Sequence, residues 1–182
     1  TPESDPTSKE PIVKIRDLNS IYIEAGDTFS VEYQKGLYVD IFPFIDYPTV
    51  PRPWAKKLCK GISVSYSILH AQHYYSLRSF AEFFYFGMKY ALFKGIWAML
   101  CLVRPKGTYL SNILINNGYG IMHRKDSVFP LSTITFEGKD FPAPGNVDAY
   151  LKDLYKNYMD IPPKEKQIVH ACYIHPELKP LP

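Results

Sequence analysis

One acidic residue lies inside an otherwise apolar run in the N-terminal part of the chain. The run is Gly36-Leu-Tyr-Val-Asp-Ile-Phe-Pro43, in which Val39 and Ile41 flank Asp40. Its β-branched and aromatic residues predict a short buried strand that stops at Pro43, because proline cannot donate to a sheet ladder. A buried carboxylate needs a cation or a hydrogen-bond donor beside it. Asp40 therefore pairs with a lysine, caps a loop, or holds a divalent metal that carries a phosphate.

Two short strands are predicted before this run. In Ile12-Val-Lys-Ile-Arg16 the side chains alternate, so Lys14 and Arg16 share one face of a strand. A turn at residues 17–20 leads to a returning strand at Ile21-Tyr-Ile-Glu24. A small sheet that carries Lys14, Arg16 and Asp40 follows, and its cations would either hold a diphosphate or lie solvated on an exposed edge.

Two long helices are predicted in the middle of the chain, from residue 54 to about 75 and from 79 to 103. The second is the most apolar segment, with a narrow polar stripe on one side. We expect it to be a core helix, with contact to a membrane surface as the alternative. A spanning helix is not expected, because Glu82, Lys89 and Lys94 interrupt the run.

Few side chains suit a metal site of the usual kind. His70 and His73 stand three apart, which is one face of a helix, but no third ligand recurs at a useful distance. The favoured interpretation is therefore aromatic packing. Cys59, Cys101 and Cys172 are odd in number and lack Cys-x-x-Cys spacing, so neither a disulfide framework nor a zinc knuckle is indicated, and a reducing cytoplasm is the simplest compartment.

The last third of the chain is predicted to be mostly irregular. Residues 127–135 read as short extended pieces. Asn146, or else Gly145, caps a helix from Val147 to about 158, which the Pro162-Pro163 pair stops. A proline-rich tail follows.

The bulk composition bounds the fold and the partners. The chain has 182 residues, of which 46% are hydrophobic, so it is long enough for one globular domain. Its first 11 residues hold three prolines and no large apolar side chain, so we expect a flexible lead-in, with a single domain over 12–182. The even balance of 21 basic and 18 acidic residues argues against a nucleic-acid partner.

Three ordered blocks of sequence resemble the LicD family of the nucleotidyltransferase superfamily, which includes the fukutin-related enzymes. The blocks are Lys14-Ile-Arg-Asp-Leu-Asn19; then Gly36-Leu-Tyr-Val-Asp-Ile-Phe-Pro-Phe-Ile-Asp46; and Phe136-Glu-Gly-Lys-Asp-Phe-Pro-Ala-Pro144 with its continuation through Tyr150-Leu-Lys-Asp-Leu-Tyr155, Ile161-Pro-Pro163 and His170. Together they cover most of the chain.

The resemblance implies an activity. Family members transfer a phosphorylated alcohol such as phosphocholine or ribitol phosphate from a CDP-linked donor to a sugar of a cell-surface glycan, such as lipopolysaccharide, teichoic acid or capsule. It implies that Asp40 is a catalytic carboxylate and a Mg²⁺ ligand. Lys14, Arg16, Asp46 and Glu137 would contact substrate. The expected location stays cytoplasmic, and a lipid-linked or surface-glycan acceptor would make peripheral contact of 79–103 with the inner face of the membrane useful.

Part of the family pattern is missing. The family's glycine turn and Asp-x-Asp pair, which supply most of the metal ligands, have no counterpart upstream of Lys14. We therefore expect the C-terminal portion of such an enzyme, with a missing N-terminal half or an oligomer partner. The alternative is a non-catalytic shortened relative that binds a glycan acceptor, a partner enzyme or a membrane surface. Two smaller departures are Ser20, where threonine is common, and Lys156, where glycine is expected.

The predicted architecture combines these elements in an α+β fold. We expect a small, mainly antiparallel N-terminal sheet, a remnant of the nucleotidyltransferase fold, covered by the two long helices. A short C-terminal helix and an irregular tail complete it. If an N-terminal half is absent, one face of the sheet should be exposed or should pair with another chain.

Overall fold

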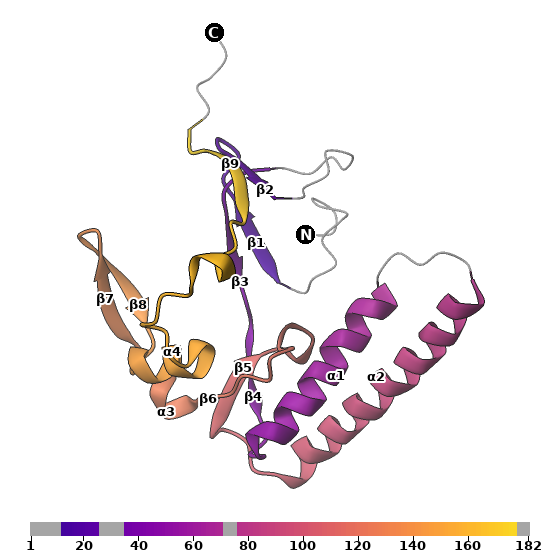
Figure 1. The fold of residues 1–182 in the computed structure, drawn as a ribbon. Coiled ribbons are helices and arrows are strands. Elements are labelled where there is room, and N and C mark those ends of the chain that lie inside the picture. The colour runs from indigo at the N-terminus through magenta and orange to yellow at the C-terminus, as the bar shows by residue number, and fades with distance from the viewer. Residues whose placement is uncertain (1–11, 26–34, 71–75, 178–182) are drawn as a thin grey trace. The chain divides into compact units, whose positions relative to one another are not determined.

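A computed structural model describes residues 12–25, 35–70 and 76–177, and the predicted lead-in at 1–11 lies outside these ranges. The fold is mixed α+β, as predicted, with small antiparallel sheets and helices (Figure 1). The chain forms two compact units. The first unit comprises residues 1–43 and 160–182, and the second comprises residues 44–159.

The first unit contains two antiparallel strand pairs. β1 (Val13–Arg16) pairs with β3 (Tyr38–Ile41), and β2 (Ile21–Glu24) pairs with β9 (Ala171–His175). A single 3-10 turn, η2 (Lys164–Lys166), precedes β9. The two strands predicted before the Asp40 run are therefore present, but the tail strand β9, which pairs with β2, was not predicted.

The sheet around Asp40 has its apolar face outward. The register sets Val13 opposite Ile41 and Ile15 opposite Val39, and these four side chains are 46% to 66% exposed. The prediction of a buried strand is wrong for this face within the first unit. The predicted cover by the long helices, which belong to the second unit, stays a prediction. Within the first unit these side chains are exposed because a two-stranded sheet has no second layer to cover its apolar face.

The second unit begins with a three-stranded sheet and a helical hairpin. β4 (Phe44–Tyr47) pairs with β5 (Tyr109–Asn112), which pairs with β6 (His123–Arg124). Between β4 and β5, α1 (Arg52–His70) and α2 (Leu77–Val103) run antiparallel and pack on each other (Figure 1). The predicted helices are confirmed, although the expected end of the first one, residues 71–75, lies outside the described ranges.

The remaining elements of this unit are short. They are η1 (Leu114–Asn116), α3 (Lys125–Val128), the β7–β8 hairpin (Ser132–Phe136 and Lys139–Ala143) and α4 (Val147–Tyr155). Asn146 caps α4 as predicted, with its side chain accepting from the Ala149 N–H at 2.9 Å. The expectation of only extended pieces from 127 was wrong at α3.

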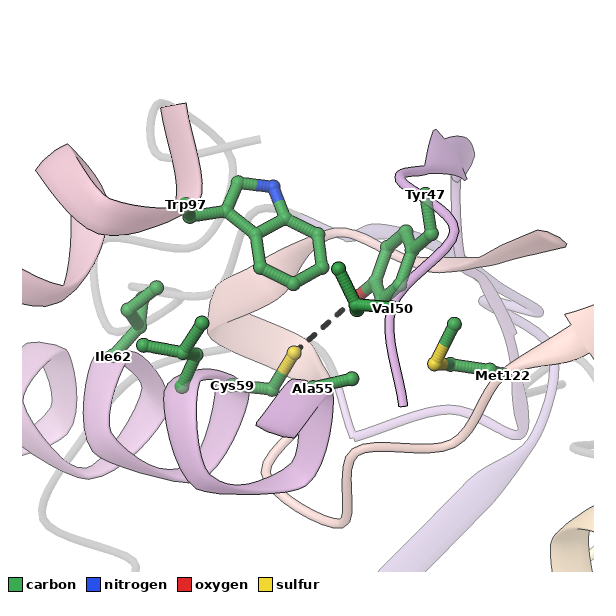
Figure 2. Close-up of a cluster of buried hydrophobic side chains, with 8 residues drawn as sticks. Tyr47, Val50, Ala55, Cys59, Ile62, Trp97 and Met122 are labelled. Atoms are coloured by element: carbon green, nitrogen blue, oxygen red, sulfur yellow. Dashed lines mark hydrogen bonds between the residues drawn. The ribbon is translucent and has the colours of Figure 1, made fainter. Parts of the chain in front are cut away.

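A compact hydrophobic core holds the hairpin to the sheet. Tyr47 from β4, Cys59 and Ile62 from α1, Trp97 from α2, and Met122 are all at most 5% exposed (Figure 2). The Tyr47 and Trp97 rings meet edge to face at 4.8 Å between centroids, an arrangement that adds to the area burial. Burial raises the pKa of the Cys59 thiol to about 11, so this cysteine is an inert core side chain.

The core-helix prediction for α2 is wrong over most of its surface. Trp97 is its only buried residue, although Tyr90, Phe93 and Leu100 also pack against the core. The helix is apolar on nearly all sides, so its composition could not reveal that only one side packs on the described residues of the second unit.

Lys156 ends α4 in a strained conformation. Its φ of 59° lies in the left-handed region, where a glycine is normally found at a helix C-terminus. We predict that Lys156→Gly raises the free energy of unfolding by about 0.5 to 1 kcal/mol, because relief of strain exceeds the added freedom of the unfolded chain. Urea denaturation followed by circular dichroism measures this. Ala149→Gly in the same helix is the control and should lower stability by about 1 kcal/mol.

Candidate functional site

Three of the predicted site residues lie together on the polar face of β1 and β3. Lys14 is directly opposite Asp40 in the register, and Arg16 is opposite Tyr38. Lys14 Nζ lies 3.5 Å from Asp40 Oδ1 and 3.7 Å from the centroid of the Tyr38 ring, and the Arg16 guanidinium lies 5.3 Å from the same centroid. The expected sheet carrying two cations and one carboxylate is thus present.

The Tyr38 ring lies beneath the Lys14 and Arg16 cations. The ring meets Tyr22 edge to face at 5.4 Å, and the Tyr38 hydroxyl donates to a Glu24 carboxylate oxygen. That hydrogen bond, with burial second, raises the pKa of Tyr38, so the phenol stays protonated at neutral pH. The ring therefore offers its negatively charged face to Lys14 and Arg16 and holds both cations on one side of the sheet.

Asp40 has a partner but not a metal site. Its Oδ1 atom is buried without a hydrogen-bond partner among the described residues, and the Lys14 ammonium group lies 3.5 Å from it. Among residues 12–25, 35–70 and 76–177, no three His, Cys, Asp or Glu side chains gather closely enough to hold a metal ion. One carboxylate next to a cation does not fit Mg²⁺, which needs several oxygen ligands.

The other two predicted site residues, Asp46 and Glu137, belong to the second unit. Asp46 Oδ1 on β4 lies 3.2 Å from Lys125 Nζ, and both side chains are more than 40% exposed. Glu137 and Gly138 form the β7–β8 turn with φ values of 49° and 74°, and Glu137 is exposed. Their positions are those of a surface ion pair and a tight hairpin turn.

The structure describes one member of the His70 and His73 pair. His73 lies outside the described residues. His70 Nδ1 lies 2.8 Å from the Tyr66 carbonyl oxygen, and the two rings stack with centroids 4.0 Å apart. The favoured interpretation of aromatic packing therefore matches the geometry of His70.

A buried histidine that the sequence did not single out lies in the second unit. His123 is 1% exposed, and its ring stacks between Phe44 and Tyr150, with centroids 5.9 Å and 4.2 Å away. Its Nδ1 lies 3.4 Å from Asp153 Oδ2, while Asp153 Oδ1 accepts a 2.6 Å hydrogen bond from Arg52. This cluster joins β6, the start of α1 and α4. Its only signal in the sequence is one histidine after the apolar pair Ile121-Met122.

An open cavity of about 530 Å³ adjoins this cluster. Its lining has three basic and two acidic side chains, together with Ser127, Asn146 and Ala149; the charged ones are Arg52, Arg124, Lys152, Asp126 and Asp153. Each basic side chain already pairs with an aspartate, at 2.5 to 2.7 Å. The cavity therefore has no cation that is left over for an anionic ligand.

The His123 cluster predicts a stability that depends on pH. Burial lowers the pKa of His123 from its ordinary value near 6.5, an effect that Asp153 opposes and only partly offsets. The unfolded chain therefore binds more protons than the folded one between the two pKa values. Stability is full above pH 6.5 and falls on acidification through that window, by at most about 1.4 kcal/mol per pH unit.

Urea denaturation midpoints measured from about pH 8 to about pH 5 test this dependence, because this range brackets the ordinary pKa of histidine. His123→Phe keeps an aromatic ring between Phe44 and Tyr150 and should flatten the profile above pH 5. The idea fails if wild-type stability rises as the pH falls through this range. His175→Phe, on the exposed strand β9 of the other unit, is the control and should keep the wild-type profile.

A scan against protein-family models, a search of curated proteins and a search of solved structures each found no match.

Proposed function

We propose that this chain is the C-terminal portion of a LicD-type phosphotransferase, which moves a phosphorylated alcohol such as phosphocholine from a CDP-linked donor to a sugar of a cell-surface glycan. The observation that carries the proposal is the pairing of β1 with β3, which puts Lys14, Arg16 and Asp40 on one face. These residues come from two separate sequence blocks that resemble the family. Their proximity in space is what a shared substrate site requires.

In this proposal the three residues have distinct roles. Lys14 and Arg16 bind the donor diphosphate, since ammonium and guanidinium groups make charge-assisted hydrogen bonds to phosphate oxygens. Asp40 accepts the proton of the attacking sugar hydroxyl as a general base. Asp46 and Glu137 stay proposed substrate contacts of the second unit, where Asp46 would first have to release Lys125.

We propose that Mg²⁺ binds only in the complete enzyme. Asp40 then contributes one carboxylate, and the other ligands come from the glycine turn and Asp-x-Asp pair that this sequence lacks. Bound there, the metal would neutralise phosphate charge. In the described chain Lys14 neutralises Asp40 in its place.

The exposed apolar face of β1 and β3 supports the need for a further segment. Val13, Ile15, Val39 and Ile41 form a contiguous apolar surface on a sheet whose polar side is the more covered one. Soluble sheets normally bury such a face. We propose that the missing strands of the nucleotidyltransferase fold, or an oligomer partner, pack there.

The backbone at Lys156 supports the match of the third block. The family has a glycine at this position, and the chain here takes a positive φ that glycine adopts without strain. Lys156 thus replaces the family's glycine while the backbone keeps a conformation that favours glycine.

Calorimetric titration of the chain with CDP-choline and with CDP tests the proposal. We expect weak binding of both ligands, about millimolar, that Mg²⁺ does not strengthen, and no binding of choline alone. Lys14→Gln with Arg16→Gln should abolish it. The matched control is Lys139→Gln with Arg104→Gln, which removes one exposed lysine and one exposed arginine from the other unit.

Two results would overturn parts of this account. No binding of CDP by a chain that is folded by circular dichroism would remove the diphosphate role of Lys14 and Arg16. Tight, Mg²⁺-dependent binding that Asp40→Asn abolishes would mean that the chain forms a complete donor site without an upstream segment.

A second candidate function is a non-catalytic relative that binds an acceptor, a partner enzyme or a membrane surface. The Lys14 and Asp40 ion pair favours it, because the carboxylate is neutralised without any metal. The two candidates differ in the full gene product. An upstream glycine turn and acid pair with measurable phosphocholine transfer supports the enzyme, and a product without transfer supports the binding protein.

A further inference from the structure

The outer face of α2 is apolar along its whole length. Eleven residues within an arc of roughly 120° are all exposed and uncharged: Leu77, Phe80, Ala81, Phe84, Met88, Ala91, Leu92, Gly95, Ala98, Met99 and Leu102. We call these residues the outer strip. Among the described residues, α2 is the one helix whose length and composition would suffice to cross a membrane.

The opposite face of α2 is fixed against α1. Tyr90, Phe93, Trp97 and Leu100 pack onto the core cluster, and a Cβ on Gly61 of α1 would come within 2.0 Å of the Phe93 ring. The two helices therefore pack closely, and α2 cannot rotate to bury the outer strip without breaking the core. The strip therefore stays on the exposed side of α2, away from the residues that pack on the core.

Charged side chains border the outer strip on both sides. Arg78, Glu82 and Lys89 lie along one margin, and Lys94 lies along the other. Glu82 is paired with Arg78 at 2.9 Å, so the net charge beside the strip is positive. An apolar strip between cations is the pattern of a helix that lies in a membrane interface.

The distribution of charge along the chain also favours an anionic membrane surface as the partner of the hairpin. α1 and α2 together hold seven basic residues and one acidic residue. The whole chain has 21 basic and 18 acidic residues, so 14 basic and 17 acidic residues remain elsewhere. The two-helix hairpin is thus strongly cationic while the rest of the chain is slightly acidic, which matches an anionic surface and not a second copy of the same cationic hairpin.

We propose that the α1–α2 hairpin docks on a bilayer of anionic phospholipid, with α2 parallel to the surface and the outer strip in the acyl region. The length of α2, about 40 Å at 1.5 Å per residue, then lies in the plane. A spanning orientation would carry Glu82, Lys89, Lys94 and the packed helix α1 into the hydrocarbon. This inference is independent of the phosphotransferase proposal.

Flotation of the full chain with vesicles tests the docking. We expect binding to vesicles of phosphatidylcholine mixed with phosphatidylglycerol, and much weaker binding to phosphatidylcholine alone. Met88→Glu with Leu92→Glu should reduce the bound fraction at least about tenfold. Lys89→Gln and Lys94→Gln should each weaken binding to anionic vesicles by about fivefold.

A matched control variant tests whether the effect is specific to the outer strip or arises at any exposed apolar side chain. Met159→Glu with Leu131→Glu makes the same two changes at positions that are 80% and 57% exposed, and should leave flotation unchanged. All variants are checked by circular dichroism for unaltered helix content.

Three outcomes would overturn the proposal. The first is no flotation with either vesicle. The second is flotation that the Met88/Leu92 and Met159/Leu131 variants lower equally. The third is a concentration-dependent dimer that Met88→Glu with Leu92→Glu dissociates while wild-type protein ignores vesicles, which would assign the strip to self-association.

Discussion

Replacing Asp40 with asparagine should lower the rate of phosphocholine transfer by the full gene product by about 10²- to 10⁴-fold. Asparagine has nearly the same size as aspartate, but it lacks the carboxylate that, in the proposed function, accepts the proton of the sugar hydroxyl. The expected signature is a loss in kcat that persists at saturating donor and Mg²⁺.

Asp140→Asn is the control for this prediction. Asp140 also lies in a two-stranded antiparallel pair, where its carboxylate accepts a 2.6 Å hydrogen bond from Thr135. Its replacement should change transfer by less than about twofold, since it lies on the exposed β7–β8 hairpin. Equal losses for the two variants would contradict the role of Asp40, as would an undiminished kcat for Asp40→Asn.

Asn117→Ala should lower the free energy of unfolding by about 3 to 5 kcal/mol. The Asn117 side chain is 3% exposed, donates to Tyr47 Oη at 2.9 Å and to the Ile121 carbonyl at 2.8 Å, and accepts from the Ile121 N–H at 2.8 Å. It thus links the loop after η1 to the core tyrosine. Alanine would leave several buried polar groups without partners, each of which costs about 1 to 3 kcal/mol.

The neighbouring Asn116 gives a matched control. Its side-chain nitrogen is buried without a hydrogen-bond partner. Asn116→Ala removes this unsatisfied donor and should therefore change the free energy of unfolding by less than about 1 kcal/mol. Urea denaturation of the two variants under the same conditions makes the comparison. A loss of less than about 1 kcal/mol for Asn117→Ala would contradict the importance of this network.

Local sequence patterns predicted where strands and helices form, but they did not predict contacts between residues far apart in the chain. Alternation at 13–16 and the capping residue Asn146 predicted β1 and the start of α4, because both signals lie within a few residues of their effect. The pairing of β2 with β9 joins residues about 150 positions apart, and the tail of the chain carries no cue to it. The end of α4 was placed too late, since Lys156 leaves the helix in a conformation that glycine usually marks.

The candidate site was predictable only in part for the same reason. Period two put Lys14 and Arg16 on one face, and the antiparallel register then set Lys14 beside Asp40. The exposure of that sheet was not predictable, because Val39 and Ile41 read as buried in any apolar strand. His123 and Asp153 lie 30 positions apart without a motif, so only the packing of α4 onto β6 and α1 reveals their contact.

The most direct test of the central claim is a titration of the isotope-labelled chain with CDP-choline, followed residue by residue in nitrogen–proton NMR spectra. We expect the largest shifts at the amides of Lys14, Arg16, Tyr38 and Asp40, and smaller shifts in the Arg16→Gln variant. Shifts centred instead on Arg52, Arg124 and Lys152, or spectra that do not change, would contradict a donor-binding surface on β1 and β3.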